Sequence, residues 1–192
     1  MVRTTATGLI TTTGRAAAIL LLCLLCLPLG AQNSRKSVKL SGDILMAAIP
    51  IGAGMTTLIK KDYTGLKQLV LSEATAFGVT YALKFAVCKE RPDGSNRYSF
   101  PSFHSAASFS GATFLQRRYG WKFGVPAYLL SSYVAWSRVY ARKHDWWDVS
   151  AGVAIGIGAS LIYSRPFASR HNLTICPVMI GERPGLYASI RF

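Results

Sequence analysis

Acidic residues are scarce in this chain, whose 192 residues include 8 Asp and Glu against 22 Lys and Arg, for a formal net charge of +14. At the same time 51% of the residues are hydrophobic, which is an unusual pairing for a soluble protein. Nucleic acid would explain the basic balance, but the cations flank apolar runs, and the sequence has no nucleic-acid motif and no alternation of aromatic and basic residues. We therefore expect a membrane, and no nucleic acid, as the partner of this chain.

Cysteine is also sparse, and the sequence has neither an internal repeat nor a low-complexity segment. Cys23 and Cys26 lie within an apolar run near the N-terminus, so their spacing is not that of a redox motif. Only Cys88 and Cys176 remain, which excludes a disulfide framework. They could pair in a soluble exported protein, whereas in a membrane-embedded protein we expect them on opposite faces and unpaired.

The N-terminal segment has the features of an export signal. Arg3 and Arg15 precede an apolar run that ends at Leu29, and small residues follow. This order predicts a signal peptide over residues 1–31, with cleavage after Ala31. An uncleaved N-terminal anchor is the alternative.

Beyond this segment, apolar stretches separated by short polar joints predict an all-α domain over residues 32–165. We place its five helices at about residues 43–60, 64–88, 103–118, 122–141 and 146–164. The long irregular link at residues 89–102 is rich in Gly, Pro, Asn and Ser. In the tail, residues 166–192, two β-prone runs at residues 173–180 and 185–192 predict a short β-hairpin.

The first of three notable residue clusters contains Lys84, Arg91 and Pro92. Lys84 and Arg91 are separated by close to two helical turns, so one helix can direct both cations the same way. A residue before proline is biased out of the helical region. We therefore expect the helix to stop around residues 88–90 and to leave Arg91 at its mouth.

The second cluster is Pro101-Ser102-Phe103-His104, and the third contains Ser137, Arg138, His144 and Asp148. His144 and Asp148 are four residues apart, which on a helix is side-chain contact distance, so the carboxylate can hold the imidazole. Each feature alone has an ordinary alternative: a snorkelling cation, an N-cap serine, an exposed His–Asp pair. Their joint occurrence in this order and spacing favours one shared site.

These residue types suit nucleophilic chemistry on a phosphate. Phosphoryl transfer needs fixed cations that balance the charge on the oxygens while a nucleophile approaches in line. The charge can come from three side chains: Lys84, Arg91 and Arg138. A histidine becomes a nucleophile when a carboxylate ties one ring nitrogen and leaves the other free, and Asp148 is placed to do this for His144. The second histidine, His104, can protonate the leaving oxygen.

The pattern Lys-x6-Arg-Pro, Pro-Ser-x-His and Ser-Arg-x5-His-x3-Asp over residues 84–148 resembles the signature of the type 2 phosphatidic acid phosphatase (PAP2) superfamily, which also includes bacterial acid phosphatases and vanadium haloperoxidases. The resemblance implies that His144 forms a phosphohistidine, that Asp148 orients it, and that His104 is the acid and later the water-activating base. It implies phosphate binding by a further set of residues: Lys84, Arg91, Ser102, the backbone amide of Phe103, and Arg138. It implies neither a metal nor a cofactor.

One position departs from the superfamily pattern, in which Pro-Ser-Gly-His is usual. Here Phe103 replaces the glycine. We expect this side chain to narrow the approach to the phosphate, and it lacks the freedom of glycine at positive φ.

The basic turns predict how the helices are oriented. If the first mature helix starts on the exported side, the non-catalytic basic turns fall in the cytoplasm: Lys60-Lys61, Arg117-Arg118, Lys122 and Arg165. This distribution agrees with the positive-inside rule. The link at residues 89–102 and residues 138–146, which carry the motif clusters, fall together on the exported side.

We therefore expect a multi-pass helical bundle in the bacterial cytoplasmic (inner) membrane that removes a phosphate from a membrane lipid at the periplasmic face. A lipid A 1- or 4'-phosphate is favoured, and undecaprenyl diphosphate, phosphatidylglycerol phosphate and phosphatidic acid are the other head groups that the resemblance offers. We expect no protein partner. Several apolar segments are short for a bilayer, so a soluble periplasmic acid phosphatase is an alternative. A vanadium haloperoxidase and a non-catalytic membrane protein are further alternatives.

Overall fold

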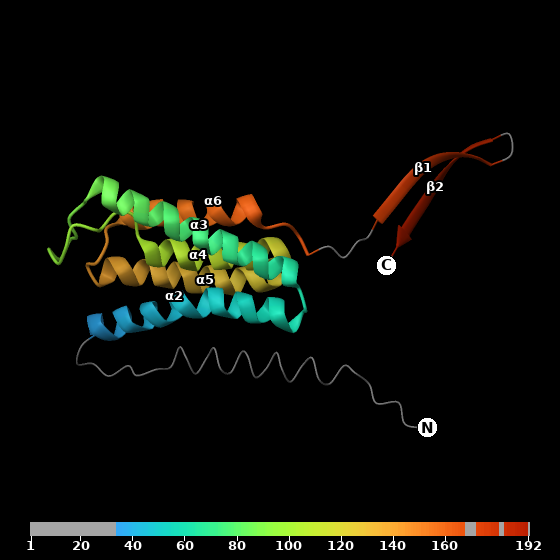
Figure 1. Cartoon of the computed structure of the whole chain (residues 1–192). Coiled ribbons are helices and arrows are strands. Elements are labelled where there is room, and N and C mark those ends of the chain that lie inside the picture. The colour runs from blue at the N-terminus through green and yellow to red at the C-terminus, as the bar shows by residue number, and fades with distance from the viewer. Residues whose placement is uncertain (1–33, 168–171, 181–182, 192) are drawn as a thin grey trace, which may run out of the picture.

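Among the described residues, five helices run back and forth as a bundle, and a β-hairpin follows them along the chain (Figure 1). The structure is a computed structural model that describes residues 34–167, 172–180 and 183–191. Its elements are α2 (Ser34–Ile59), α3 (Tyr63–Val87), α4 (Phe103–Tyr119), α5 (Trp121–Tyr140), α6 (Trp146–Tyr163), β1 (Asn172–Ile180) and β2 (Arg183–Arg191). The predicted five-helix bundle is confirmed, while the signal peptide predicted for residues 1–31 lies outside the described residues.

Helix α4 forms the centre of the bundle, because it contacts each of α2, α3, α5 and α6. Its buried positions are mostly Ser, Ala and Gly. Small residues let helix backbones approach closely, which is typical of helices that pack within membranes. Cβ atoms added at Gly152 and Gly156 of α6 would lie 2.4 Å from the Ser102 carbonyl oxygen and 2.2 Å from the Ala106 carbonyl oxygen. Only glycine therefore permits α6 to lie this close to α4.

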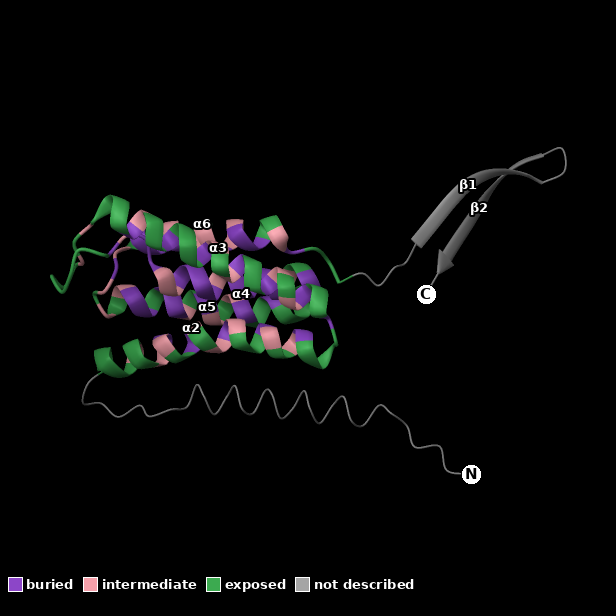
Figure 2. Cartoon of the chain, in the orientation of Figure 1, coloured by how far each residue is buried: buried purple, intermediate pink, exposed green. Residues whose placement is uncertain are grey.

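The outer faces of the helices carry large apolar side chains, and Leu58, Val70, Leu129 and Ile162 are all more than half exposed. Figure 2 shows the buried positions on the inside of the bundle and exposed positions along its outer surface. By length and composition, α2, α3 and α6 are each able to cross a membrane. An exposed apolar surface of this kind needs lipid around it. The protein is thus an integral membrane helical bundle, as predicted.

Helix α2 begins earlier than predicted, at Ser34 instead of about residue 43. Its first turns are rich in Lys and Arg, so they lack the apolar periodicity from which a helix is predicted. They are tied to α5 all the same, because the hydroxyl oxygens of Ser41 and Tyr133 lie 2.8 Å apart. The early start places Asp43 inside the helix instead of at its beginning.

Two further predictions from the sequence are confirmed. Helix α3 stops at Val87, and Cys88 adopts a left-handed backbone conformation with a φ of 49°. The C-terminal hairpin is present, because β1 and β2 pair antiparallel in a register that places Asn172 opposite Arg191 and Ile180 opposite Arg183.

Candidate active site

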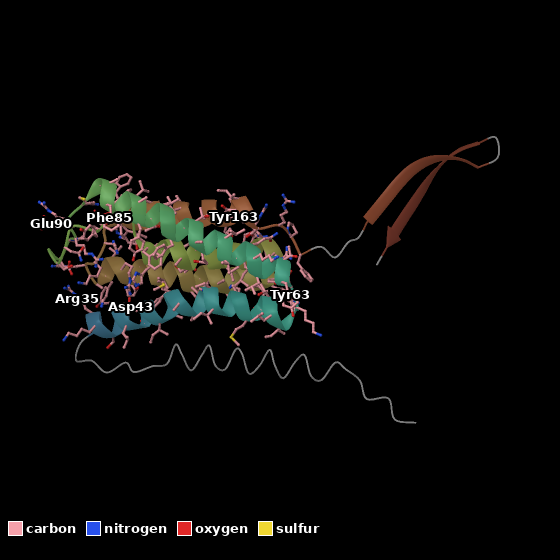
Figure 3. The ribbon with its side chains drawn as sticks, viewed as in Figure 1. Arg35, Asp43, Tyr63, Phe85, Glu90 and Tyr163 are labelled. Atoms are coloured by element: carbon pink, nitrogen blue, oxygen red, sulfur yellow. The ribbon has the colours of Figure 1, made fainter. Side chains whose placement is uncertain are left out.

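The three residue clusters meet at one end of the bundle, which we call the site end. It is formed by the start of α2, the end of α3, the start of α4 and the connection between α5 and α6 (Figure 1). Asp43, Phe85 and Glu90 lie toward this end, whereas Tyr63 and Tyr163 lie toward the opposite end (Figure 3). The site is therefore assembled from segments that are distant along the chain.

Direct contacts join the clusters to one another. The Lys84 Nζ donates to the Pro101 carbonyl oxygen at 2.7 Å, which joins the first cluster to the second. The Ser102 N–H donates to the Asp148 carbonyl oxygen at 2.9 Å, which joins the second cluster to the third. The structure thus brings the sequence-predicted site residues together at one place.

Lys84 is buried at the end of α3, with 7% of the residue exposed. Besides Pro101, its Nζ donates to the Tyr98 carbonyl oxygen at 2.8 Å. These two bonds fasten the end of the link between α3 and α4 to α3. An ammonium group carries a third N–H, which is left for an anion.

Arg91 lies just past the end of α3. Its N–H donates to the Asn96 carbonyl oxygen at 2.9 Å, and its carbonyl oxygen accepts from the Gly94 N–H at 2.9 Å, so this part of the link is a compact turn. The side-chain Nε is buried and has no hydrogen-bond partner among the described residues. A buried donor without a partner is costly in free energy. The guanidinium is therefore a strong candidate to bind an anion.

The start of α4 presents backbone N–H groups at the site end. Ser102 is the N-cap residue, and its side chain makes no capping hydrogen bond. Its hydroxyl is buried and accepts from the Ser105 hydroxyl at 3.1 Å. The first N–H groups of a helix lack partners within the helix, and a helix N-terminus favours anions. The amides of Phe103 and His104 can therefore serve as donors to a phosphate oxygen.

Phe103 is accommodated without the strain that its replacement of glycine suggested. It is the first residue of α4 and is not among the residues with positive φ. Its ring packs edge-on against the rings of Phe77 and Tyr81 on α3, at centroid distances of 5.5 and 5.8 Å. The side chain therefore belongs to the contact between α3 and α4, and the position does not need the conformational freedom of glycine.

The sequence had suggested that His144 and Asp148 share one helix face, but they do not. Helix α6 begins at Trp146, and His144 lies in the turn before it. The cause is a capping box: the Asp145 carboxylate accepts from the Asp148 N–H at 2.9 Å, and the Asp148 carboxylate accepts from the Asp145 N–H at 3.1 Å. The turn still brings the His144 Nδ1 to 3.6 Å from the Asp148 Oδ2. This distance is longer than a hydrogen bond, and Nδ1 has no partner among the described residues.

The carboxylate of Asp148 is fully buried and is held by residues that the sequence did not single out. Its Oδ1 accepts from the Lys89 Nζ at 2.9 Å, and its Oδ2 accepts from the Ser99 hydroxyl. Lys89 and Ser99 lie in the irregular link between α3 and α4, where no periodicity predicts contacts. These bonds fix the carboxylate in a position from which it can orient the His144 ring.

His144 is buried, with 4% of the residue exposed. Burial lowers the pKa of this imidazole, and the positive charges of Lys84 and Arg91 lower it further, against the opposing effect of Asp148. The ring is therefore neutral near pH 7. A neutral imidazole is the form that can act as a nucleophile.

His104 and Arg138 meet on one carboxylate, that of Asp43 on α2. The Asp43 Oδ1 lies 2.6 Å from the Arg138 Nη1 and 2.8 Å from the His104 Nε2. Sequence reasoning missed Asp43, because this residue lies outside the three clusters. No local signal identifies it, since its partners are distant along the chain.

Arg138 is also tied to other groups and is 1% exposed. Its Nη2 donates to the Lys39 carbonyl oxygen at 2.7 Å, and its Nε donates to the Ser137 hydroxyl at 3.2 Å. A Cβ added at Gly42 would lie 2.1 Å from the Ser137 Oγ, so α2 can approach α5 this closely only with glycine there. The remaining N–H groups of the guanidinium are left for an anion.

Taken together, these groups are those needed to hold a phosphate beside a nucleophile. The site end combines a neutral buried imidazole, cations with donors to spare and the amides of a helix start. Within the part of the chain that the structure describes, no group of three or more His, Cys, Asp or Glu side chains is placed to hold a metal ion.

Comparison with known proteins supports this chemistry. The sequence profile of the PAP2 superfamily matches residues 65–171, which include all three clusters. The chain is 33% identical over 135 residues to a lipid A 4'-phosphatase of Helicobacter pylori, covering 64% of this chain and 67% of that protein. It is 34% identical over 115 residues to a lipid A 1-phosphatase of Porphyromonas gingivalis, covering 54% of this chain but 26% of that protein.

Two solved structures share the fold. The crystal structure of Aquifex aeolicus LpxE matches with a TM-score of 0.53 at 22% identity, over 63% of this chain and 84% of that one. A PAP2-type phosphatidylglycerolphosphate phosphatase from Bacillus subtilis matches with a TM-score of 0.53 at 22% identity, over 80% of this chain and 84% of that one. The profile covers more than half of the sequence and includes the residues that meet at the site end. This chain belongs to the PAP2 superfamily.

Proposed function

We propose that this protein is a membrane lipid phosphatase that removes a phosphate from lipid A through a phosphohistidine on His144. The observation that carries the proposal is the environment of His144: a buried imidazole, 3.6 Å from the fixed carboxylate of Asp148, in the field of Lys84 and Arg91. These surroundings keep the ring neutral and surround its target with positive charge.

The proposed reaction has two steps. In the first, the His144 Nε2 attacks the phosphorus, the bond between phosphorus and the lipid oxygen breaks, and His104 gives its proton to that oxygen. In the second, water attacks the phosphohistidine while His104 takes a proton from it, the P–N bond breaks, and inorganic phosphate leaves. Asp148 stabilises the positive charge that develops on the His144 ring during the attack.

The donors left free at the site end would stabilise the phosphate oxygens in both steps. They come from four groups: the Arg91 guanidinium, the third N–H of Lys84, the unused N–H groups of Arg138, and the Phe103 amide. Fixed donors of this kind contribute most where negative charge is concentrated in the transition state. We assign Ser102 the supporting role of holding the start of α4 against Asp148.

Two exposed tryptophans support a substrate that lies in the membrane. Trp146 and Trp147 are 59% and 79% exposed at the start of α6, two and three residues after His144. Tryptophan side chains favour the level of the lipid head groups. Their position supports a site at the depth where the phosphate of a membrane lipid lies.

A groove between α2 and α3 supports the same substrate class. It has a volume of about 550 Å³, and apart from Glu73 its lining is apolar and includes Leu69, Val70, Phe77 and Phe103. Phe103, the first residue of α4, lines this groove and precedes His104 in the sequence. An acyl chain in this groove would place the attached head group near His144.

Lipid A is favoured because both curated relatives described above are lipid A phosphatases. The Bacillus subtilis structure belongs to a phosphatidylglycerolphosphate phosphatase, so that lipid is a second substrate to test. Undecaprenyl diphosphate and phosphatidic acid are the other two substrates to test.

The test is phosphate release by the purified protein from these four lipids. We expect release from lipid A without an added metal and in the presence of EDTA. His144→Ala should reduce the rate at least ~10³-fold, because removal of a covalent nucleophile abolishes the pathway. His171→Ala, the same substitution at a histidine outside the clusters, should retain full activity. An active His144→Ala variant would overturn the proposed mechanism.

The same assays separate the alternatives. Vanadate should inhibit a phosphatase, whereas vanadate-dependent oxidation of a halide would indicate a haloperoxidase. Recovery of active protein in buffer without detergent would indicate a soluble acid phosphatase. Release of no phosphate from any substrate by the wild type would indicate a non-catalytic membrane protein.

We further propose that the protein lies in the bacterial inner membrane with the site end facing the periplasm. The predicted export signal precedes α2, and α2 starts at the site end, which supports this orientation. Charge supports it less than the sequence suggested, because basic residues also gather at the site end, among them Arg35, Lys36, Arg142 and Lys143.

Labelling of cysteine tests this orientation. Cys88 is exposed at the site end. In a variant whose other cysteines are replaced by serine, a membrane-impermeant maleimide should label Cys88 in intact spheroplasts. In a variant that also lacks Cys88, Lys61→Cys, at the opposite end, should be labelled only after permeabilisation. The reverse pattern would contradict the orientation.

A further inference from the structure

We infer that Asp43 is a positioning residue that holds His104 in place for proton transfer, an inference that rests on the proposed phosphatase function. Asp43 lies on α2, outside the residues 65–171 that the superfamily profile matches. Its Oδ1 nevertheless contacts a residue from each of two motif clusters, His104 and Arg138. A residue outside the motifs thus completes the site.

The contact with Asp43 determines which nitrogen of His104 is available. His104 is the second residue of α4, and its Nε2 is 2.8 Å from the Asp43 Oδ1. No hydrogen bond to the described residues uses Nδ1. With the carboxylate accepting the Nε2 proton, Nδ1 is the nitrogen left to exchange a proton with the substrate or with water.

The surroundings of Asp43 keep its carboxylate in place. The Arg138 guanidinium is buried and donates both to Asp43 and to the Lys39 carbonyl one turn earlier on α2. Lys39 adds a weaker contact, with its Nζ 3.7 Å from the Asp43 Oδ2. Because Gly42 lets α2 approach Arg138 closely, the backbone beside Asp43 is fixed against α5. The three groups that face Asp43 all carry or can carry positive charge, so the carboxylate stays ionised.

Asp43 acts on the reaction through His104. Before the first step the carboxylate stabilises the protonated ring, which then gives its Nδ1 proton to the lipid oxygen as the O–P bond breaks. In the second step the ring recovers a proton from the attacking water. Asp43 itself neither gains nor loses a proton, and its charge keeps the ring oriented with Nδ1 toward the site through both steps.

Comparison of two substrates with different leaving groups, the lipid and p-nitrophenyl phosphate, tests this role. The lipid alkoxide needs a proton as it leaves, whereas p-nitrophenolate does not. We expect Asp43→Asn to reduce the kcat for the lipid about 10²-fold. The rate of the initial burst of p-nitrophenolate should stay within a few-fold of the wild-type rate. A slow steady state should follow, because hydrolysis of the phosphohistidine still needs His104.

Ser41→Ala is the matched control. Ser41 lies two residues away on α2 and also bonds to α5, through Tyr133, but among the described residues it makes no hydrogen bond to His104 or Arg138. This variant should retain both activities. A double-mutant cycle adds a second measurement: in a His104→Gln background, Asp43→Asn should cause little further loss, since it acts through the ring that is already missing.

The outcomes distinguish this inference from the function on which it rests. If the wild type releases no phosphate, both fail. If the wild type is active and Asp43→Asn slows release of both leaving groups by the same factor, with no burst of p-nitrophenolate, Asp43 is a structural residue and the inference is wrong. An increase in activity would show that Asp43 competes with the phosphate, which would also overturn it. Should Asp43→Asn not fold, Asp43→Glu keeps the charge but displaces it, and the same split between leaving groups is expected.

Discussion

Each end of the bundle contains an aspartate paired with a buried arginine, and the two pairs differ in how completely they are satisfied. At the end opposite the site, the Arg118 Nε donates to the Asp62 Oδ2 at 2.6 Å, and the Arg118 Nη2 donates to the other oxygen. The Tyr119 hydroxyl and the Gly65 N–H also donate to Asp62, at 2.8 and 2.9 Å. The Arg118 Nη1 donates to the Arg165 carbonyl oxygen at 2.9 Å.

At the site end, several polar side chains lack the hydrogen-bond partners that Arg118 and Asp62 have. The Arg91 Nε and the His144 Nδ1 are buried and lack partners among the described residues. Arg138 is anchored, but it keeps N–H groups to spare. The fully bonded pair of Arg118 and Asp62 therefore fastens helices, whereas the groups at the site end are prepared for a ligand that brings its own acceptors.

The largest expected contrast comes from the same substitution at both ends. Arg138→Gln should reduce kcat/KM about 10²-fold, because it removes donors from the phosphate and a partner from Asp43. Its melting temperature should fall less than that of Arg118→Gln, since Asp43 is partly exposed and keeps contacts with His104 and Lys39. Phosphate release and thermal unfolding in the same detergent measure the two effects.

Arg118→Gln should show the opposite behaviour. It leaves the buried Asp62 carboxylate without its main partner, which costs about 3–5 kcal/mol of unfolding free energy. The activity of each folded molecule should be unchanged, because Arg118 is at the far end of the bundle from the proposed site. If Arg118→Gln abolished catalysis in folded protein, the distinction between the two ends would be wrong.

Arg91→Gln should change the pH dependence of activity, an effect that Arg118→Gln should not have. Besides about a tenfold loss in kcat/KM from a missing phosphate donor, it removes a positive charge that lowers the pKa of His144. Without this charge the pKa of His144 rises, so the ring stays protonated to a higher pH and the acidic limb of the activity profile should move to higher pH. A profile that keeps its shape would show that Arg91 does not act on His144.

The smallest expected effect concerns the ion pair between Lys143 and Asp93, which joins the turn before α6 to the link that carries Arg91. The Lys143 ammonium lowers the pKa of Asp93 through a hydrogen bond. The stability from this pair is therefore present above the ordinary pKa of aspartate and is lost as the pH falls through the lowered value. Asp93→Asn should raise KM by a few-fold and reduce stability by less than ~1 kcal/mol. Loss of most activity would show that the pair is part of the site.

Much of this architecture could be predicted from the sequence, because its signals are local. Apolar runs gave the five helices, and Pro92 after Arg91 gave the end of α3 near Val87. The motif spacing gave the residues that meet at the site end. These features depend on periodicity, on proline and on short-range order.

The features that could not be predicted depend on contacts between distant segments. The early start of α2 follows from its contacts with α5, and its charged sequence shows no apolar pattern. The position of His144 before α6 follows from the capping box, which the sequence Asp-x-x-Asp at residues 145–148 could have revealed. The contact of Asp43 with His104 and Arg138 has no local signal, because it joins three helices.

The most direct test of the account is to trap the covalent intermediate. Wild-type protein mixed with ³²P-labelled substrate and quenched within milliseconds should carry a label that is stable to base and labile to acid, and mass spectrometry should locate it on His144. His144→Ala should carry none. With ³²P-labelled p-nitrophenyl phosphate, whose leaving group needs no proton, His104→Gln should accumulate the label, because the phosphohistidine still forms while its hydrolysis is slowed. A label on another residue, or turnover by the wild type with no labelled protein at any time, would contradict the claim that the segments converging at the site end serve His144 as the nucleophile.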